Sequence, residues 1–83
     1  MVFSSVGDSI DVLVAFRKNR PEPMVIKWNN RHYQVRKVHR VHLEQNERER
    51  TIHFSVTDDR WLFHVSFSPN TLRWKLDEMA PVV

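Results

Sequence analysis

The amino-acid sequence predicts an all-β protein, and three observations lead to this class. Apolar and polar side chains alternate with a period of two along most of the chain, which is typical of half-buried strands. The alternating runs are rich in β-branched and aromatic residues, which favour strands. Asn, Asp and Pro gather between the runs, where chain reversals are expected. We therefore expect a six-stranded antiparallel meander, either a strongly twisted sheet or a small barrel.

Six alternating runs define the expected strands. In chain order they cover residues 10–17, 24–28, 31–43, 51–57, 60–67 and 72–77. The chain has 83 residues, which is enough for one small domain and not for two. We predict a single domain over 1–83, built from an N-terminal segment 1–9, a β-meander 10–77 and a C-terminal tail 78–83.

The turn residues predict how the strands pair. Asn29-Asn30 suits a two-residue type I′ turn, because Asn tolerates a positive φ. This turn sets Trp28 opposite Arg31. The softer turn at 46–49 sets Leu43 near Ile52. Three further connections predict the pairs Phe16 with Met24, Val56 with Trp61, and Phe67 with Leu72.

The third run, 31–43, is too long for one straight strand. Its core-facing positions are odd-numbered at both ends, yet this pattern would bury Lys37 and His39. A bulge or sharp bend near 36–39 removes the conflict, because an extra residue changes the side that each later residue faces. A long bent strand shared between two halves of a sheet is how small barrels close.

Two short motifs resemble a known family. Residues 28–38 read Trp-Asn-Asn-Arg-His-Tyr-Gln-Val-Arg-Lys-Val, and residues 73–76 read Arg-Trp-Lys-Leu. Together they resemble a set of small bacterial proteins classed as a domain of unknown function (the DUF6504-like group). The resemblance spans 16–76 and departs from the family pattern at 29–30, where the family has Arg-Gly. It implies no established activity and no catalytic residues.

Composition excludes several classes of function. The chain has no Cys and one Gly, which excludes disulfides, thiolate zinc sites and glycine-rich phosphate loops. No apolar run approaches the ~20 residues of a membrane span, and the N-terminus does not resemble a secretory signal. Ser, His and Asp occur without the arrangement of a nucleophilic site. We expect a cytoplasmic, non-catalytic binding module without a cofactor and without membrane contact.

Positive charge is concentrated in residues 23–43, which contain no acidic residue. Alternation directs five cations away from the core. They are Lys27, Arg36, Arg40, Arg73 and Lys75. A basic outer face of this kind predicts contacts to the phosphates of nucleic acid. The alternative is a solvated sheet face whose charges discourage aggregation. Since the strand aromatics have core parity, contacts to the nucleic-acid backbone are expected rather than base stacking.

Four apolar residues break the polar pattern of the outer face. They are Leu13, Ala15, Val25 and Leu62. An exposed apolar patch indicates a partner, so a protein–protein adaptor or a homodimer that uses this patch and the exposed sheet edges is the alternative function. The chain's own ends, with Val2, Phe3 and Val6 or with Met79, Val82 and Val83, are the other candidates to cover it.

Three histidines are expected in one cross-strand row. The predicted registers place His53 opposite both His42 and His64 on the polar face. Neighbouring imidazoles in such a row are close enough for metal ligation. We nevertheless expect no metal site, because no carboxylate is placed to orient the rings and Lys75 follows in the same row.

Overall fold

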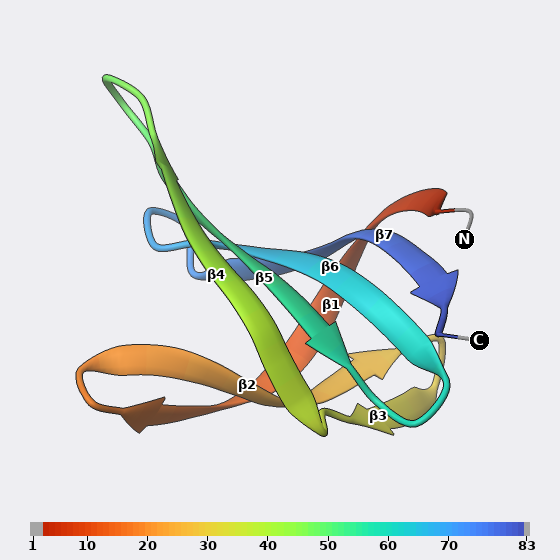
Figure 1. Ribbon diagram of the computed structural model, residues 1–83. Helices are drawn as coiled ribbons and strands as arrows, with labels where there is room; N and C mark the ends of the chain where they lie inside the picture. Colours follow the sequence, from red (N-terminus) through yellow and green to blue (C-terminus); the bar gives the residue numbers. More distant parts are fainter. Residues whose placement is uncertain (1–2, 83) are drawn as a thin grey trace.

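Seven strands form the fold in the computed structural model, which describes residues 3–82 (Figure 1). They are β1 Ser4–Arg17, β2 Arg20–Trp28, β3 Arg31–Gln34, β4 Lys37–Gln45, β5 Arg50–Thr57, β6 Trp61–Ser68 and β7 Arg73–Pro81. The predicted all-β class is confirmed. The strand number is seven and not six, because the long third run divides into β3 and β4. No helix in residues 3–82 is suited to crossing a membrane.

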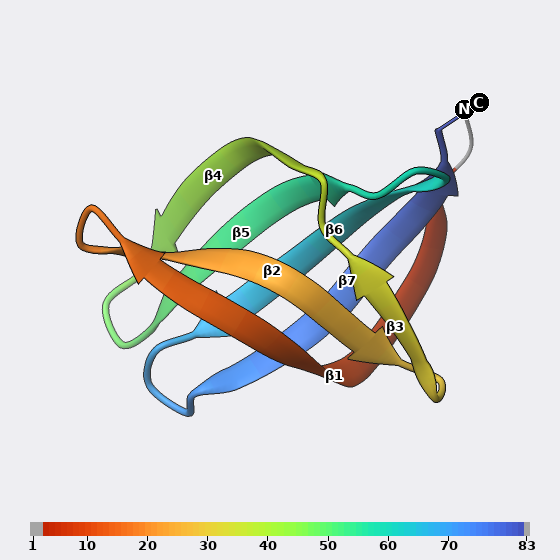
Figure 2. The ribbon, with the colours of Figure 1, turned by 90° about the horizontal axis from the view of Figure 1, so that it is seen from below.

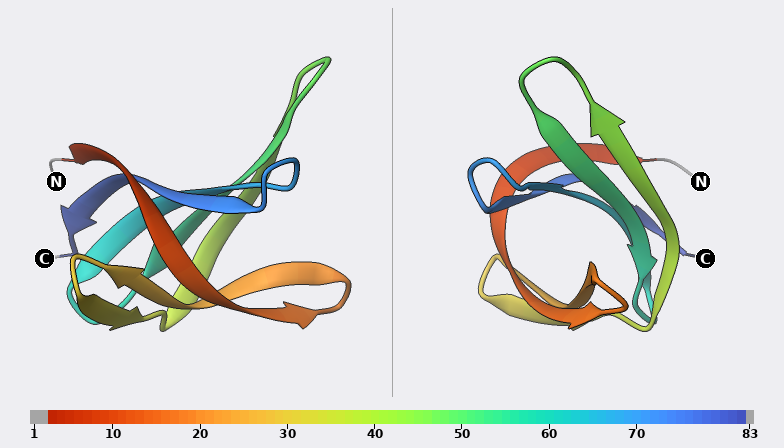
Figure 3. Two further views of the ribbon diagram at one scale, coloured as in Figure 1. Left: turned by 180° about the vertical axis from the view of Figure 1, so that it is seen from behind. Right: turned by 90° about the vertical axis from the view of Figure 1, so that its left-hand side faces the viewer.

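The strands form one antiparallel sheet in the order β3-β2-β1-β7-β6-β5-β4. The sheet curls into a half-barrel, which is clearest in the right-hand view of Figure 3. The first half of β1 pairs with β7 and its second half pairs with β2. The first strand therefore joins the last, as in a closed meander, and the sheet is instead open between β3 and β4, where the long third run divides.

Both chain ends contribute to the sheet. Ser4 lies opposite Met79 and Ser5 opposite Glu78. Residues 4–9 and 78–81, expected as an N-terminal segment and a tail, are therefore parts of β1 and β7. Sequence alternation did not predict this pairing, because it joins residues at the two extremes of the chain.

The predicted bend of the long third run is confirmed. The amide N–H of Val35 donates to the carbonyl oxygen of Met24 (2.9 Å), and that of Arg36 donates to the carbonyl oxygen of Thr57 (2.8 Å). Two successive residues thus bond to strands near opposite ends of the sheet, β2 and β5. The register also shifts between Val38 and Arg40, which marks a bulge.

The tight turn at Asn29-Asn30 is confirmed. Both residues have positive φ, 52° and 61°, and Trp28 lies opposite Arg31. The predicted pair of Leu43 with Ile52 is also confirmed. These connections were predictable because their lengths and turn residues agree with one register.

The expected register of the first hairpin is wrong. A two-residue turn, Lys18-Asn19, replaces the expected longer loop, with φ values of 53° and 64°. Phe16 therefore lies opposite Pro21 and not opposite Met24. Asn19, Pro21 and Pro23 suggested a loop, but both prolines lie within β2, whose outer edge is unpaired there in the described residues.

The expected pair of Val56 with Trp61 is also wrong, because Val56 lies opposite Phe63. The Oδ1 atom of Asp58 accepts hydrogen bonds from the backbone N–H groups of Arg60 and Trp61, each at 2.7 Å. Trp61, the first residue of β6, therefore pairs with Pro81 of β7 and not with β5, whose last residue Thr57 lies opposite Leu62. The shift is two residues, so every side chain keeps its predicted face.

The last hairpin shifts in the same way. Phe67 lies opposite Trp74 and not opposite Leu72. Leu72 belongs to the connection, where its N–H donates to the carbonyl oxygen of Ser68 at 2.7 Å. Leu72 is exposed because it lies in this connection, although the alternating pattern predicted a buried position in a strand.

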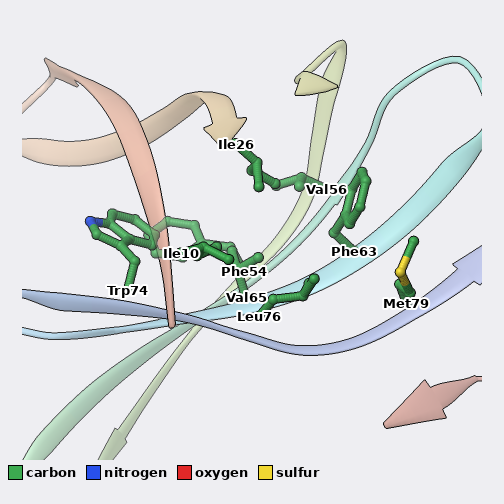
Figure 4. Packing of buried hydrophobic residues seen from close by; sticks show 9 residues of the cluster. All are labelled: Ile10, Ile26, Phe54, Val56, Phe63, Val65, Trp74, Leu76 and Met79. Carbon is green, nitrogen blue, oxygen red and sulfur yellow. The ribbon is translucent and has the colours of Figure 1, made fainter. Parts of the chain in front are cut away.

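The inner face of the half-barrel holds the hydrophobic core (Figure 4). Phe54, Phe63 and Leu76 are almost completely buried there. Trp74 packs against Phe54 with ring centroids 5.4 Å apart, and Tyr33 packs edge-on against Phe63 at 5.2 Å. Most of the strand aromatics thus serve the core, as their parity predicted. Phe16 is the exception, with 76% of its surface exposed.

Leu72 has φ of 58° and is 75% exposed, so it occupies a left-handed conformation without compensating burial. We expect Leu72→Gly to raise the free energy of unfolding by about 1 kcal/mol, because glycine adopts this conformation without the penalty of a Cβ atom. Urea denaturation measures the change. The matched control is Leu13→Gly, since Leu13 is 66% exposed within strand β1 and glycine weakens a strand. Equal losses in both variants would contradict the conformation of Leu72.

Candidate nucleic-acid interface

The half-barrel is open along a seam between β2 and β4 (Figure 2). Strand β2 pairs with β3 only over Val25–Trp28, and β4 pairs only with β5. Within residues 3–82, the outer edge of β2 over residues 20–23 therefore has no strand partner. Pro21 and Pro23 lie in this part and have no amide hydrogen to donate, which is why prolines are confined to edges and bulges of sheets. The two prolines help to keep the seam open.

A groove of about 550 Å³ follows this seam. Its walls come from the start of β2 and from the bend and first half of β4. Four cations line it: Arg20, Arg36, Lys37 and Arg40. The one acidic residue among the lining residues is Glu22. All four cations are exposed, so their charged groups are available to a bound molecule.

The bulge in β4 brings the cations to the groove. Val38 lies opposite Val56 and Arg40 opposite Ser55, which leaves His39 as the extra residue. The Nε2 atom of His39 lies 2.9 Å from the Oγ1 atom of Thr57. Because the extra residue changes the parity, Lys37 and Arg40 lie on the same face of the sheet, opposite Thr57 and Ser55, although they are an odd number of positions apart.

One of the four cations has an acidic partner. The Nε atom of Arg36 lies 3.5 Å from the Oδ1 atom of Asp59, and both side chains are more than half exposed. Exposed pairs of this kind contribute about 0–1 kcal/mol, so a phosphate can replace the carboxylate at small cost. Arg20, Lys37 and Arg40 form no salt bridge with any residue of the described range 3–82.

The structure brings together only two of the five predicted basic residues. Arg36 and Arg40 line the seam groove. Lys27 lines a different groove beside Asp11, and Arg73 lines a third groove. Lys75 lies in the sheet between Ser9 and Ser66. These residues are on different strands of a curled sheet, so a common outward parity does not give them a common surface.

Sequence reasoning missed two groove residues. Arg20 was placed in a loop, and Lys37 was given core parity by the alternation of the long third run. The sequence did contain a signal for Lys37. The alternating pattern would have buried this cation, and the bulge that removes the conflict lies in the most basic part of the chain. No local sequence signal shows that Arg20 lies across the groove from β4.

The expected histidine row forms only in part. His42 lies opposite His53, as predicted, with ring centroids 6.2 Å apart. His64 lies opposite Ser55 and not opposite His53, because the register of that hairpin differs by two residues. Sequence parity correctly placed all three rings on the outer face but not in one row.

Carboxylates contact two of these rings, contrary to expectation. The Nε2 atom of His53 lies 3.0 Å from Glu44, and the Nδ1 atom of His64 lies 3.3 Å from Glu78. Phe3 also stacks on His64 at 4.7 Å. Within residues 3–82 no three His, Asp or Glu side chains are grouped in a way that suits a metal ion.

The predicted apolar patch divides into two places. Leu13 lies opposite Val25 and lines a groove of about 630 Å³, and Ala15 lies half-buried further along β1. Leu62 is separate, on β6, where it shares a smaller groove with Val82. The C-terminal tail therefore lies beside Leu62. Of the other expected covering residues, Phe3 stacks on His64, Val6 packs against the core and Met79 is buried in it. Val2 and Val83 lie outside the described residues.

No family model matches the chain, and no match was found among curated proteins or solved structures. The resemblance to the DUF6504-like group therefore stays a prediction. Guanidinium and ammonium groups donate charge-assisted hydrogen bonds to phosphate or carboxylate oxygens, and Arg does so with two parallel N–H groups.

Proposed function

We propose that this domain binds nucleic acid through the phosphate backbone, in the groove between β2 and β4. The observation that carries the proposal is the set of four exposed cations that lines this groove against a single acidic residue. The chain as a whole has a net charge of only +3, so the groove concentrates positive charge well above the average for the surface.

The burial of the aromatic rings favours contacts to phosphates over contacts to bases. Phe54, Phe63 and Trp74 are buried, so they offer no ring on which an unpaired base can stack. Phe16 is exposed but is not among the residues that line the groove. We therefore expect binding to double-stranded nucleic acid with little dependence on base sequence.

The salt dependence of binding tests this proposal. Fluorescence anisotropy of a labelled short duplex DNA, titrated with the full chain between about 50 and 200 mM salt, gives the slope of log K against log salt concentration. Three or four phosphate contacts predict a slope of about −3 to −4, since each contact contributes about 0.9. No binding at the lowest salt concentration contradicts the proposal. Equal binding of poly-glutamate shows a general anion site instead.

A protein partner on the groove beside Leu13 is the second candidate. Leu13 is 66% exposed next to Val25, and no described residue covers it. An apolar interface depends little on salt, because screening acts on charges. A salt-insensitive interaction that is lost in Leu13→Asp and kept in Arg40→Glu would favour this second function.

A further inference from the structure

In the part of the chain that the structure describes, strand β4 ends the sheet and leaves one edge free. It pairs with β5 on one side only, and nearly all its residues are exposed. The hairpin formed by β4 and β5 projects beyond the rest of the half-barrel (Figures 1 and 3). Proteins usually protect such edges with prolines, bulges or short strands. The part from Arg40 to Gln45 has no proline and no register shift.

The hydrogen bonds of the hairpin show which backbone groups of β4 are free. The N–H of Asn46 donates to the carbonyl oxygen of Glu49 at 3.0 Å, so Asn46 faces β5. Residues of an antiparallel pair alternate between facing their neighbour strand and facing away. The backbone groups of Val41, Leu43 and Gln45 therefore point to the open edge.

We propose that two copies of this chain pair antiparallel along these β4 edges, with the two-fold axis at Leu43. In this register Leu43 lies opposite the partner's Leu43, and Val41 lies opposite the partner's Gln45. The three residues of each copy whose backbone groups point to the open edge then complete a regular antiparallel ladder. Each facing pair in it exchanges two hydrogen bonds.

The edge is complementary to itself in this register. Leu43 and Val41 are 53% and 44% exposed on the inner face, and the axis brings the two leucines into contact. On the outer face, His42 lies opposite the partner's Glu44. The carboxylate of Glu44 also contacts His53 of its own chain at 3.0 Å, so it is held on this face. The apolar contact on the inner face and the pairing of an imidazole with a carboxylate on the outer face both favour a second copy as the partner of this edge.

The neighbouring registers are less favourable. An axis at Val41 sets Arg40 opposite the partner's His42, which places two basic groups together. An axis at His42 sets two histidines face to face and brings the bulge at His39 into the ladder, where its backbone cannot pair regularly. The axis at Leu43 avoids the bulge. It also leaves Arg40 available to the seam groove, so this proposal does not depend on the proposed function.

Single-cysteine variants test the register. The chain has no Cys, so only the introduced thiol can cross-link. Facing residues of such a pair have Cα atoms ~5.5 Å apart, which suits a disulfide. We expect Leu43→Cys to form a disulfide-linked dimer under mild oxidation, measured by mass spectrometry. Val41→Cys and Leu13→Cys, both exposed, are the matched controls and should cross-link at least tenfold more slowly. Faster cross-linking of either control overturns the proposal.

Sedimentation of the full chain tests the association itself. We expect a reversible monomer–dimer equilibrium, and we expect Leu43→Asp to weaken it about a hundredfold, because two like charges then meet at the axis. Leu13→Asp changes charge equally at another exposed leucine and should leave the equilibrium unchanged. Circular dichroism confirms that both variants are folded. A chain that stays monomeric at every concentration, or a dimer that survives Leu43→Asp, contradicts the proposal.

Discussion

Replacing Phe63 with alanine lowers the free energy of unfolding by about 3–5 kcal/mol, the largest effect that we expect from a single substitution. Phe63 is completely buried and packs against Tyr33. Its removal leaves a cavity in a core formed by one curled sheet. Since small domains are stable by only about 5–15 kcal/mol, the variant should be close to unfolding. Urea denaturation followed by tryptophan fluorescence measures the change.

The matched control is the same substitution at an exposed position. Phe16 is 76% exposed near the end of the first hairpin, so Phe16→Ala should change stability by less than about 0.5 kcal/mol. The alternating pattern placed both residues in the core, and only the structure separates them. A similar loss in the two variants would show that the first hairpin folds back onto the core.

Reversing two charges in the seam groove should weaken duplex binding strongly. We expect Arg20→Glu/Arg40→Glu to reduce affinity at low salt roughly a hundredfold and to make the salt slope shallower by about two. The two residues come from opposite walls of the groove, so the variant removes two phosphate contacts and adds repulsion. Anisotropy with the same duplex measures both quantities.

The control for this variant carries the same change of charge at other places. Lys27→Glu/Arg73→Glu also changes the net charge from +3 to −1, but both residues lie outside the seam groove. We expect a smaller loss of affinity and a salt slope within about half a unit of the original. Equal losses in the two double variants would mean that binding follows total charge and not the groove.

Local patterns predicted the strands well, because burial on one face forces alternation. The turn at Asn29-Asn30 was predictable for the same reason, since its residues and its length agree on one register. The bend near 36–39 followed from a conflict in parity. These features depend on residues close together in sequence.

Features that depend on distant residues were not predictable. The pairing of Ser4 with Met79 joins the two ends of the chain, and no local pattern specifies it. The turn around Asp58 depends on two side-chain hydrogen bonds, which shift the register by two without changing any face. The alternating pattern cannot detect a register error of two residues, because each side chain keeps its face. That error was nevertheless enough to move His64 away from His53.

The candidate site also depends on residues that are distant in sequence. Parity correctly indicated that Arg36 and Arg40 are exposed, but exposure does not say which cations share a surface. The curl of the sheet separates Lys27 and Arg73 from them and adds Arg20 from the start of β2. The groove exists because the half-barrel is open between β2 and β4, and this opening is a property of the whole sheet.

Chemical shift mapping of the backbone amides during titration with a short duplex DNA locates the binding surface. If the seam groove binds the phosphate backbone, the largest shifts fall on Arg20, Glu22 and residues 36–41, and they diminish as salt is added. The amides of Lys27, Arg73 and Lys75 should shift little. Equal shifts across all the basic residues, or shifts confined to residues around Leu13 and Val25, would contradict a nucleic-acid site in the groove.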